Sequence, residues 1–163
     1  MNRAIAVLVI ACVAALVVPA APVAAQDRSA IRGHLANRAK SQMGTNYRYG
    51  GESPKRGFDC SGFTRWTFKK VTNLPHNSMR QYRLGRRDAY RRINRRTKLK
   101  RGDLVFFKTT RDKVGHVGVY LSKGRFVHAS SSAAKVTISS VHDKYYYGPR
   151  FQGGVRIPQL IKG

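Results

Sequence analysis

The sequence has few acidic residues. Only seven Asp and Glu accompany 32 Lys and Arg, so the formal net charge of the 163 residues is +25. A charge imbalance of this size attracts polyanions and raises the rate at which they meet the protein. The composition therefore predicts an anionic partner, and nucleic acid is the first candidate for a chain that stays inside the cell.

The sequence also lacks an apolar run long enough to span a bilayer comfortably. An almost unbroken apolar run covers residues 4–18, and small residues lead from it to Ala25. These features are typical of a secretory signal that is cut after Ala25, so residues 1–25 are predicted to be removed and no stable membrane insertion is expected. A lipidated Cys12 is the alternative, but the apolar run continues past Cys12, where a lipidation site should end it.

Cleavage would leave 138 residues, 26–163, which suits a single domain with a core at about residues 29–158. Loss of Arg3 leaves 31 cations against 7 acids, a net charge of +24. Export redirects the expected partner from nucleic acid to anionic wall polymers, lipopolysaccharide or acidic peptides. We predict a periplasmic or secreted monomer, because no extended apolar surface pattern indicates a second subunit.

Cysteine is scarce as well. The chain has only Cys12 and Cys60, and Cys12 leaves with the predicted signal. In an oxidising compartment the remaining thiol has no partner for an internal disulfide. A lone cysteine is more often an inert buried residue than a reactive one, so its surroundings must decide between the two.

Two helices are predicted in the first half of the chain. The first, at residues 29–43, has an apolar residue at every fourth position: Ile31, Leu35, Ala39 and Met43. The second extends from Cys60 to about Val71, with Asp59 as a plausible N-cap. The glycines and the proline of residues 45–57 predict a loop between the two helices, and this loop leads to Asp59 and Cys60.

The second half begins with a basic segment and continues with strands. From Arg80 to Arg101 there are eleven basic residues and one acid, Asp88, with no firm period, which predicts an irregular or partly helical basic surface. Strand-like composition follows at residues 104–107, 117–121, 126–127 and 136–138. Helices followed by strands predict an α+β fold, in which the helices pack on a small antiparallel sheet.

Cys60 lies where a thiol can be activated. The pattern Phe58-Asp59-Cys60-Ser61-Gly62-Phe63 places it in the first turn of the predicted helix. A thiol reacts as the thiolate, and the exposed amides and dipole of a helix N-terminus stabilise a negative sulfur. The backbone N–H of Cys60 is also the first candidate donor to the oxyanion of a tetrahedral intermediate.

The candidate bases are His116 and His128, and their relative position can be partly derived. A three-residue hairpin loop at residues 122–124 would pair Gly118 with His128 and place His116 diagonal to His128 on the same face. Diagonal neighbours have Cα atoms roughly 7–8 Å apart, within reach of two imidazoles. A two-residue loop would place the two histidines on opposite faces, so the arrangement depends on this register.

These residues fit a nucleophile, base and orienter: Cys60 attacks, His116 takes the proton and His128 orients His116. Each has a structural alternative, because a histidine on a strand is more often structural than catalytic. A metal site is disfavoured, since two histidines and one cysteine lack a closely spaced fourth ligand, and no cofactor is expected. The residues alone therefore leave an enzyme plausible but undecided.

Over nearly all of residues 35–157 the chain resembles the NlpC-type family of papain-like cell-wall cysteine peptidases. The segments that carry the resemblance are 47–51, 58–63, Leu74 and Pro75 with Ser78 and Gln81, 99–107, 115–121, 126–130, and Arg150 and Phe151 with 155–157. Each segment is weak by itself, but their order and spacing together are specific. The resemblance implies a Cys60, His116 and His128 site in a papain-like fold, with the Tyr47 hydroxyl at the oxyanion hole.

The resemblance also implies a substrate, the bond between D-glutamate and a diamino acid in peptidoglycan or an adjoining cross-link. Asp59 and Ser61 look like positions that meet the amino group of the stem peptide in relatives. Helix capping by Asp59 and a first-turn polar role for Ser61 are equally good interpretations.

Two departures from the family pattern matter. Many relatives carry a wall-binding repeat, which is not found here, and residues 80–101 are unusually basic. Our hypothesis is that this basic surface holds the enzyme on anionic envelope polymer, with a merely solvated surface as the alternative. A cationic envelope-binding protein with an inactive site is a competing function, but Cys60, His116 and His128 are all present, which favours the peptidase. A toxin-like effector is another, but effectors are often exported without a cleavable signal, and this chain is predicted to have one.

Overall fold

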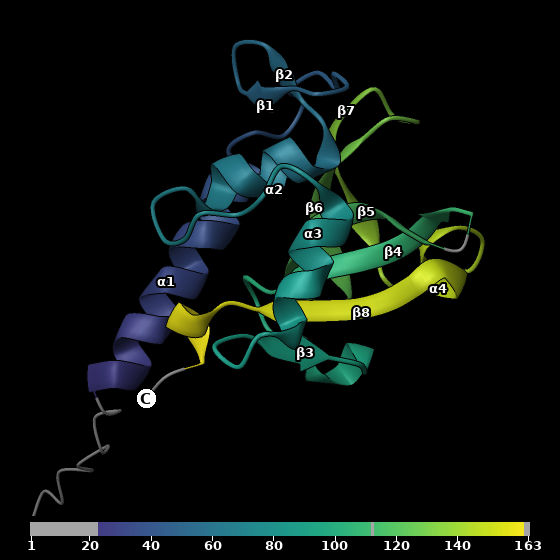
Figure 1. The fold of residues 1–163 in the computed structure, drawn as a ribbon. Coiled ribbons are helices and arrows are strands. Elements are labelled where there is room, and N and C mark those ends of the chain that lie inside the picture. The colour runs from purple at the N-terminus through teal and green to yellow at the C-terminus, as the bar shows by residue number, and fades with distance from the viewer. Residues whose placement is uncertain (1–22, 112, 162–163) are drawn as a thin grey trace, which may run out of the picture.

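The computed structural model describes residues 23–111 and 113–161, with side chains from Asp27 onward (Figure 1). Its helices are α1 (Val23–Lys40), α2 (Cys60–Phe68), α3 (Ser78–Arg83) and α4 (Tyr147–Arg150). The predicted signal segment lies outside the described residues except for positions 23–25, which begin α1. Among the helices of the described part, none is long and apolar enough to cross a membrane.

A six-stranded antiparallel sheet forms the centre of the fold, in the order β3-β8-β4-β5-β6-β7. Its strands are β3 (Arg91–Ile93), β4 (Leu104–Thr110), β5 (Lys113–Ser122), β6 (Arg125–Ser130), β7 (Lys135–Ser140) and β8 (Phe151–Arg156). Helices α1 and α2 pack on this sheet, so the predicted α+β class is confirmed.

The sheet is covered on both faces, and β4 shows this most clearly. Leu104 and Phe106 belong to the core between the sheet and the helices, whereas Val105 and Phe107 belong to a second core on the other face. All four side chains are fully buried. Alternate residues of a strand point to opposite faces, which explains why the run Leu-Val-Phe-Phe is apolar throughout instead of alternating with polar residues.

The two predicted helices are present, with shifted ends. Leu35 and Ala39 are fully buried, as their spacing predicted, but α1 ends at Lys40 and Met43 is 45% exposed. The prediction for Met43 was wrong because the chain turns before it. Gly44, with φ of 83°, then donates its backbone N–H to the carbonyl of Val136 on β7.

The glycine-rich segment before α2 is more ordered than a loop. It contains a two-stranded antiparallel pair, β1 (Glu52–Ser53) and β2 (Gly57–Phe58). Asn46 and Tyr47 form bridges to Lys135 of β7 and to Phe58. These contacts hold the segment beside α2 and place Tyr47 close to the start of that helix.

The basic segment is partly helical, as predicted, and also contributes a strand that was not predicted. It contains α3, the 3₁₀ turns η1 (Leu84–Arg86) and η2 (Arg96–Lys98), and the edge strand β3. In Figure 1 β3 lies at the opposite end of the molecule from β1 and β2, and α3 lies between β3 and α2.

The turn of the β5–β6 hairpin differs from the prediction. Ser122 pairs with Arg125, which leaves a two-residue turn at Lys123 and Gly124 in place of the three-residue loop. Both turn residues have positive φ, 50° and 73°, the backbone that short hairpin turns favour.

A bulge in β5 restores the predicted register beyond this turn. The pairing shifts by one residue between Tyr120 and Ser122, and Val119 then pairs with Val127 as the three-residue loop would have required. Because the bulge adds one residue to β5, His116 and His128 lie on the same face despite the shorter turn.

Asp103, at the start of β4, is a completely buried carboxylate. It accepts hydrogen bonds from Arg156 Nε and Nη2 at 2.8 and 2.7 Å, and from the backbone N–H of Lys100 at 2.7 Å. Arg32 of α1 approaches it to 3.6 Å. This buried cluster connects α1, β4 and β8.

Candidate active site

Cys60 is the first residue of α2, and the start of this helix is held firmly. Asp59 caps it by accepting from the backbone N–H of Gly62 at 2.7 Å. A Cβ at position 62 would meet the carbonyl oxygen of Gly51, so glycine allows the helix to pack against that segment. The thiol is directed at the carbonyl of Gly115, with 3.8 Å between sulfur and oxygen.

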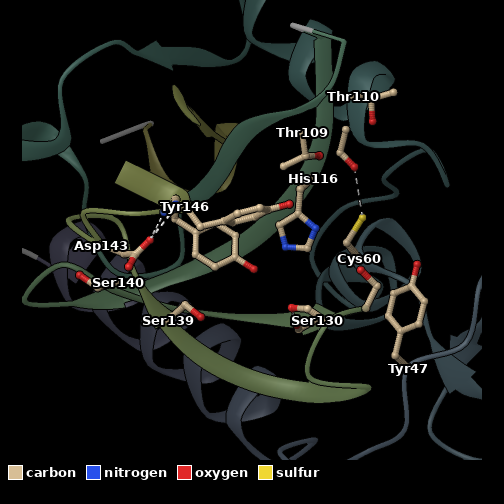
Figure 2. Close-up of a pocket in the computed structure, with 14 residues that line it drawn as sticks. Tyr47, Cys60, Thr109, Thr110, His116, Ser130, Ser139, Ser140, Asp143 and Tyr146 are labelled. Atoms are coloured by element: carbon tan, nitrogen blue, oxygen red, sulfur yellow. Dashed lines mark hydrogen bonds between the residues drawn. The ribbon is translucent and has the colours of Figure 1, made fainter. Parts of the chain in front are cut away.

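The two histidines form a hydrogen-bonded pair next to this thiol. His116 Nε2 lies 2.9 Å from His128 Nδ1, and the two rings are nearly perpendicular, at 88°. Since Nε2 is engaged with His128, Nδ1 is the nitrogen of His116 left for Cys60. Figure 2 shows the side chains of Cys60 and His116 in one cleft, with Tyr47 on the far side of Cys60.

The cleft has a volume of about 880 Å³ and an unusual lining. Most of its side chains carry hydroxyl groups: Tyr47, Thr109, Thr110, Ser130, Ser131, Ser132, Ser139, Ser140, Tyr146 and Tyr147. Asp143 is its one carboxylate, and no lysine or arginine is among the lining residues. In a chain with a net charge of +25, the cleft is thus free of the cations that dominate the rest of the surface.

Burial keeps Cys60 and His116 uncharged. Burial, followed by the charge of Asp59, raises the pKa of Cys60 to about 11, although the backbone N–H groups of Val117 and Ser61 act in the opposite direction. Burial lowers the pKa of His116 to about 4. At neutral pH the pair is therefore a thiol beside a neutral imidazole, which is ready to accept the proton.

Tyr47 keeps its hydroxyl proton in this setting. Burial, and after it the negative charges that Cys60 and Asp59 can carry, raises the pKa of the Tyr47 hydroxyl. The side chain lines the cleft beside Cys60. A protonated hydroxyl at this position is a donor for an oxyanion that forms at Cys60.

Asp59 and Ser61 are engaged within the protein and do not line the cleft. Besides Gly62, Asp59 accepts from the Ser61 hydroxyl at 3.0 Å and from the backbone N–H of Gly50 at 3.0 Å. His76 Nε2 is 2.9 Å from the same carboxylate. The capping role is therefore observed, while contact with a substrate amine stays a prediction.

Two side chains near the site, Tyr147 and Ser139, were missed by the sequence analysis, and the contacts of a third, His76, were not foreseen. Tyr147 packs against both histidines, with ring centroids 5.8 Å from His116 and 5.2 Å from His128. Ser139 Oγ lies 3.0 Å from His128 Nε2, and His76 bridges Asp59 and Glu52. The buried Gln81, known only as a family motif residue, accepts from Thr64 and donates to the carbonyls of Ser61 and Pro75.

Within the described ranges, no group of three or more His, Cys, Asp or Glu side chains could hold a metal ion.

The comparison with protein families settles the relationship of this chain. Residues 44–155 match the NlpC/P60 family. The chain belongs to the NlpC/P60 family. This range contains Cys60, the His116–His128 pair and every residue that lines the cleft.

Relatives in the family carry peptidase names. The probable endopeptidase NlpC homolog of Haemophilus influenzae is 45% identical over 114 residues, which cover 69% of this chain and 56% of that protein. Murein DD-endopeptidase MepH of Escherichia coli is 38% identical over 113 residues, 68% of this chain and 40% of that protein. The chain thus spans about half the length of these relatives.

Solved structures show the same fold. The peptidoglycan hydrolase RipB of Mycobacterium tuberculosis has a TM-score of 0.65 and 30% identity, with 89% of this chain and 74% of that chain covered. An NlpC/P60 family protein of Bacillus cereus has a TM-score of 0.67 and 29% identity, with 77% and 40% covered. The papain-like fold implied by the sequence resemblance is confirmed.

Proposed function

We propose that this protein is a cysteine peptidase that hydrolyses peptide stems or cross-links of peptidoglycan. The observation that carries the proposal is the thiol of Cys60 at the start of α2, in one cleft with the hydrogen-bonded His116 and His128. This is the arrangement that nucleophilic acyl transfer requires. The names of the relatives support peptidoglycan as the substrate.

In the proposed reaction the sulfur of Cys60 attacks the carbonyl carbon of the scissile amide while its proton passes to His116 Nδ1. The backbone N–H of Cys60 and the Tyr47 hydroxyl donate to the oxyanion. Collapse of the intermediate breaks the C–N bond, and His116 gives its proton to the leaving amine. Water, deprotonated by His116, then attacks the thioester and releases the acid and the free thiol.

The bond we propose is the one between D-glutamate and the diamino acid. Two relatives bear different names in this respect, murein DD-endopeptidase for MepH and gamma-DL-glutamyl hydrolase for a Bacillus subtilis protein that is 35% identical over 115 residues. The second name supports the D-glutamyl bond, and the first supports a cross-link. The products distinguish them.

The test is mass spectrometry of purified muropeptides and sacculi after incubation with the mature protein under reducing conditions. Cys60→Ala should lower the rate by at least about a thousandfold, because it removes the group that forms the covalent intermediate. His34→Ala, at an exposed position of α1, is the matched control and should keep full activity. Product masses identify the bond, and no cleavage by the intact protein would contradict the proposal.

Export to the periplasm or the medium belongs to the same proposal, and it is supported by the apolar run of residues 4–18 before Ala25. The mass of the exported protein tests it. A mature chain that begins at Gln26 is expected, whereas a full-length or lipidated product would contradict cleavage after Ala25.

The basic segment supports a second element of the proposal, attachment to anionic envelope polymer. Nine of its cations are exposed and make no ion pair among the described residues: Arg80, Arg83, Arg86, Arg87, Arg91, Arg95, Lys98, Lys100 and Arg101. Asp88 is the segment's only acid. Binding to isolated sacculi should weaken as salt is raised, and salt-independent binding would contradict attachment by charge.

A cationic envelope-binding protein with little hydrolase activity is the alternative function, and the same nine cations favour it. It predicts that the intact protein and Cys60→Ala bind sacculi equally and that neither releases fragments.

A further inference from the structure

We propose that Ser139 is a positioning residue, which fixes the proton on His128 and thereby leaves His116 Nδ1 free to accept the proton of Cys60. The inference rests on the proposed cysteine chemistry but not on any particular substrate. It adds a fourth side chain, on a third strand, to the Cys60, His116 and His128 site.

The three polar side chains form a diagonal row across β5, β6 and β7. In the β6–β7 register His128 pairs with Thr137, so Ser139 is its diagonal neighbour on the same face. His116 is 2.9 Å from His128 on one side, and Ser139 is 3.0 Å from His128 on the other. The hydrogen bonds therefore continue from the base through His128 to the serine hydroxyl.

A neutral imidazole has one donor and one acceptor nitrogen, so this chain of hydrogen bonds can run in only two directions. If Ser139 accepts from His128 Nε2–H, then His128 Nδ1 accepts from His116 Nε2–H, and His116 Nδ1 keeps a free lone pair. If Ser139 donates instead, His128 Nδ1–H donates to His116, and the proton of His116 is left on Nδ1. Only the first direction leaves a base facing Cys60.

The surroundings favour the first direction. His128 is completely buried, and burial, followed by the charge of His116, lowers its pKa to about 2, so it stays neutral. Ser139 is only partly buried and lines the cleft, where water or a substrate oxygen can take its hydroxyl hydrogen. With its own hydrogen directed into the cleft, Ser139 has a lone pair available for His128 Nε2–H.

Three variants separate this role from general packing. Ser139→Val removes the acceptor, and Ser139→Thr, whose side chain has nearly the shape of valine, retains the hydroxyl. Thr137→Val is the matched control, since it removes a hydroxyl from the same strand at a position that does not line the cleft. Circular dichroism and thermal unfolding establish that each variant is folded.

Two measurements report on the relay without any cell-wall substrate. Nitrogen-15 NMR of labelled histidines should show, in the unaltered protein, hydrogen on Nε2 and none on Nδ1 in both His116 and His128. The pH profile of Cys60 alkylation by iodoacetamide follows proton transfer from the thiol. In Ser139→Val the imidazoles should show mixed tautomers and alkylation at neutral pH should slow about tenfold, the equivalent of one lost hydrogen bond.

Ser139→Thr and Thr137→Val should both alkylate within about twofold of the unaltered protein. The proposal is overturned if His128 carries its hydrogen on Nδ1 in the unaltered protein, a result that does not depend on any variant folding. It is also overturned if Ser139→Val keeps the original tautomers and alkylation rate, or if Thr137→Val slows alkylation as much. Expected tautomers and alkylation without muropeptide cleavage would support the relay and contradict the peptidoglycan substrate.

Discussion

The cleft beside Cys60 and the basic segment of residues 80–101 are opposite in chemistry although one cationic chain forms both. No lysine or arginine is among the residues that line the cleft, whereas nine exposed cations crowd the basic segment around one acid. In the cleft the candidate catalytic groups are held by contacts: His116 by His128 and Tyr147, and the start of α2 by Asp59. Catalysis needs this fixed geometry, while attraction of a polyanion needs only density of charge.

The absence of cations from the cleft also has a chemical reason. Burial already lowers the pKa of His116 to about 4. A lysine or arginine beside it would lower that pKa further, because a like charge disfavours the protonated imidazolium. The neutral hydroxyl lining thus protects the basicity of His116 in a strongly cationic protein.

Buried and exposed charges should differ most in their contribution to the free energy of unfolding. Asp103→Ala should lower the free energy of unfolding by about 3–5 kcal/mol, because it leaves Arg156 buried without its partner. Urea denaturation measures the change. Glu52→Ala, which breaks an ion pair with Arg65 whose side chains are 52% and 41% exposed, should cost no more than about 1 kcal/mol.

If Asp103→Ala and Glu52→Ala lowered the free energy of unfolding equally, buried charge would contribute no more to stability than exposed charge. The exposed cations of the basic segment extend the same test, since Arg91→Ala should change stability by no more than about 0.5 kcal/mol.

Acidification should lower the free energy of unfolding through His116 and His128. In the unfolded chain both imidazoles have a pKa near 6.5, while in the folded protein burial lowers that of His116 to about 4 and that of His128 to about 2. Below pH 6.5 the unfolded chain therefore takes up protons that the folded chain does not. Stability is full above pH 6.5 and falls on acidification, by up to roughly 1.4 kcal/mol per pH unit for each histidine.

Urea denaturation between about pH 7 and pH 5 measures this slope. His116→Gln should remove about half of it, whereas His34→Gln, at an exposed position, should leave it unchanged. A slope that survives the loss of His116 would contradict the assignment of a buried neutral imidazole.

The sequence predicted the parts of the site that depend on local pattern. The position of Cys60 at a helix start follows from Asp59 and the apolar spacing after it, and the shared face of His116 and His128 follows from strand alternation. The hairpin register was obtained with the wrong turn, because a bulge in β5 compensates for the shorter loop. A bulge is fixed by packing on both sides of a strand and leaves little trace in a single sequence.

The contacts missed at the site depend on pairings far apart in the chain. Ser139 reaches His128 only through the β6–β7 register, and the four residues between Ser130 and Lys135 gave no signal of that register. Tyr147 reaches both histidines from α4, a four-residue helix without an apolar period. Local patterns carry no information about such tertiary contacts.

The basic segment was predicted as one surface, but the structure divides it. Arg92 lies over the Tyr82 ring at 3.9 Å and donates to the Tyr82 carbonyl, and Arg96 lies over Phe151 at 4.7 Å. These two arginines pack on aromatic rings, and the other nine basic residues of the segment, seven arginines and two lysines, are exposed. Composition alone does not separate the two groups, since stacking depends on where the aromatic rings come to lie.

The smallest effect is expected when exposed cations are exchanged. This exchange tests whether the location of a cation matters for binding to the envelope polymer. In Arg87→Gln/Arg91→Gln, binding to isolated sacculi should weaken, and the slope of log binding constant against log salt should fall by about one for each cation in contact. Lys55→Gln/Lys70→Gln removes the same charge from exposed positions outside the basic segment and should bind nearly as the unaltered protein does. Equal weakening in both pairs would mean that total charge, and not the surface of residues 80–101, attracts the polymer. The basic segment would then have no binding role of its own to set against the chemistry of the cleft.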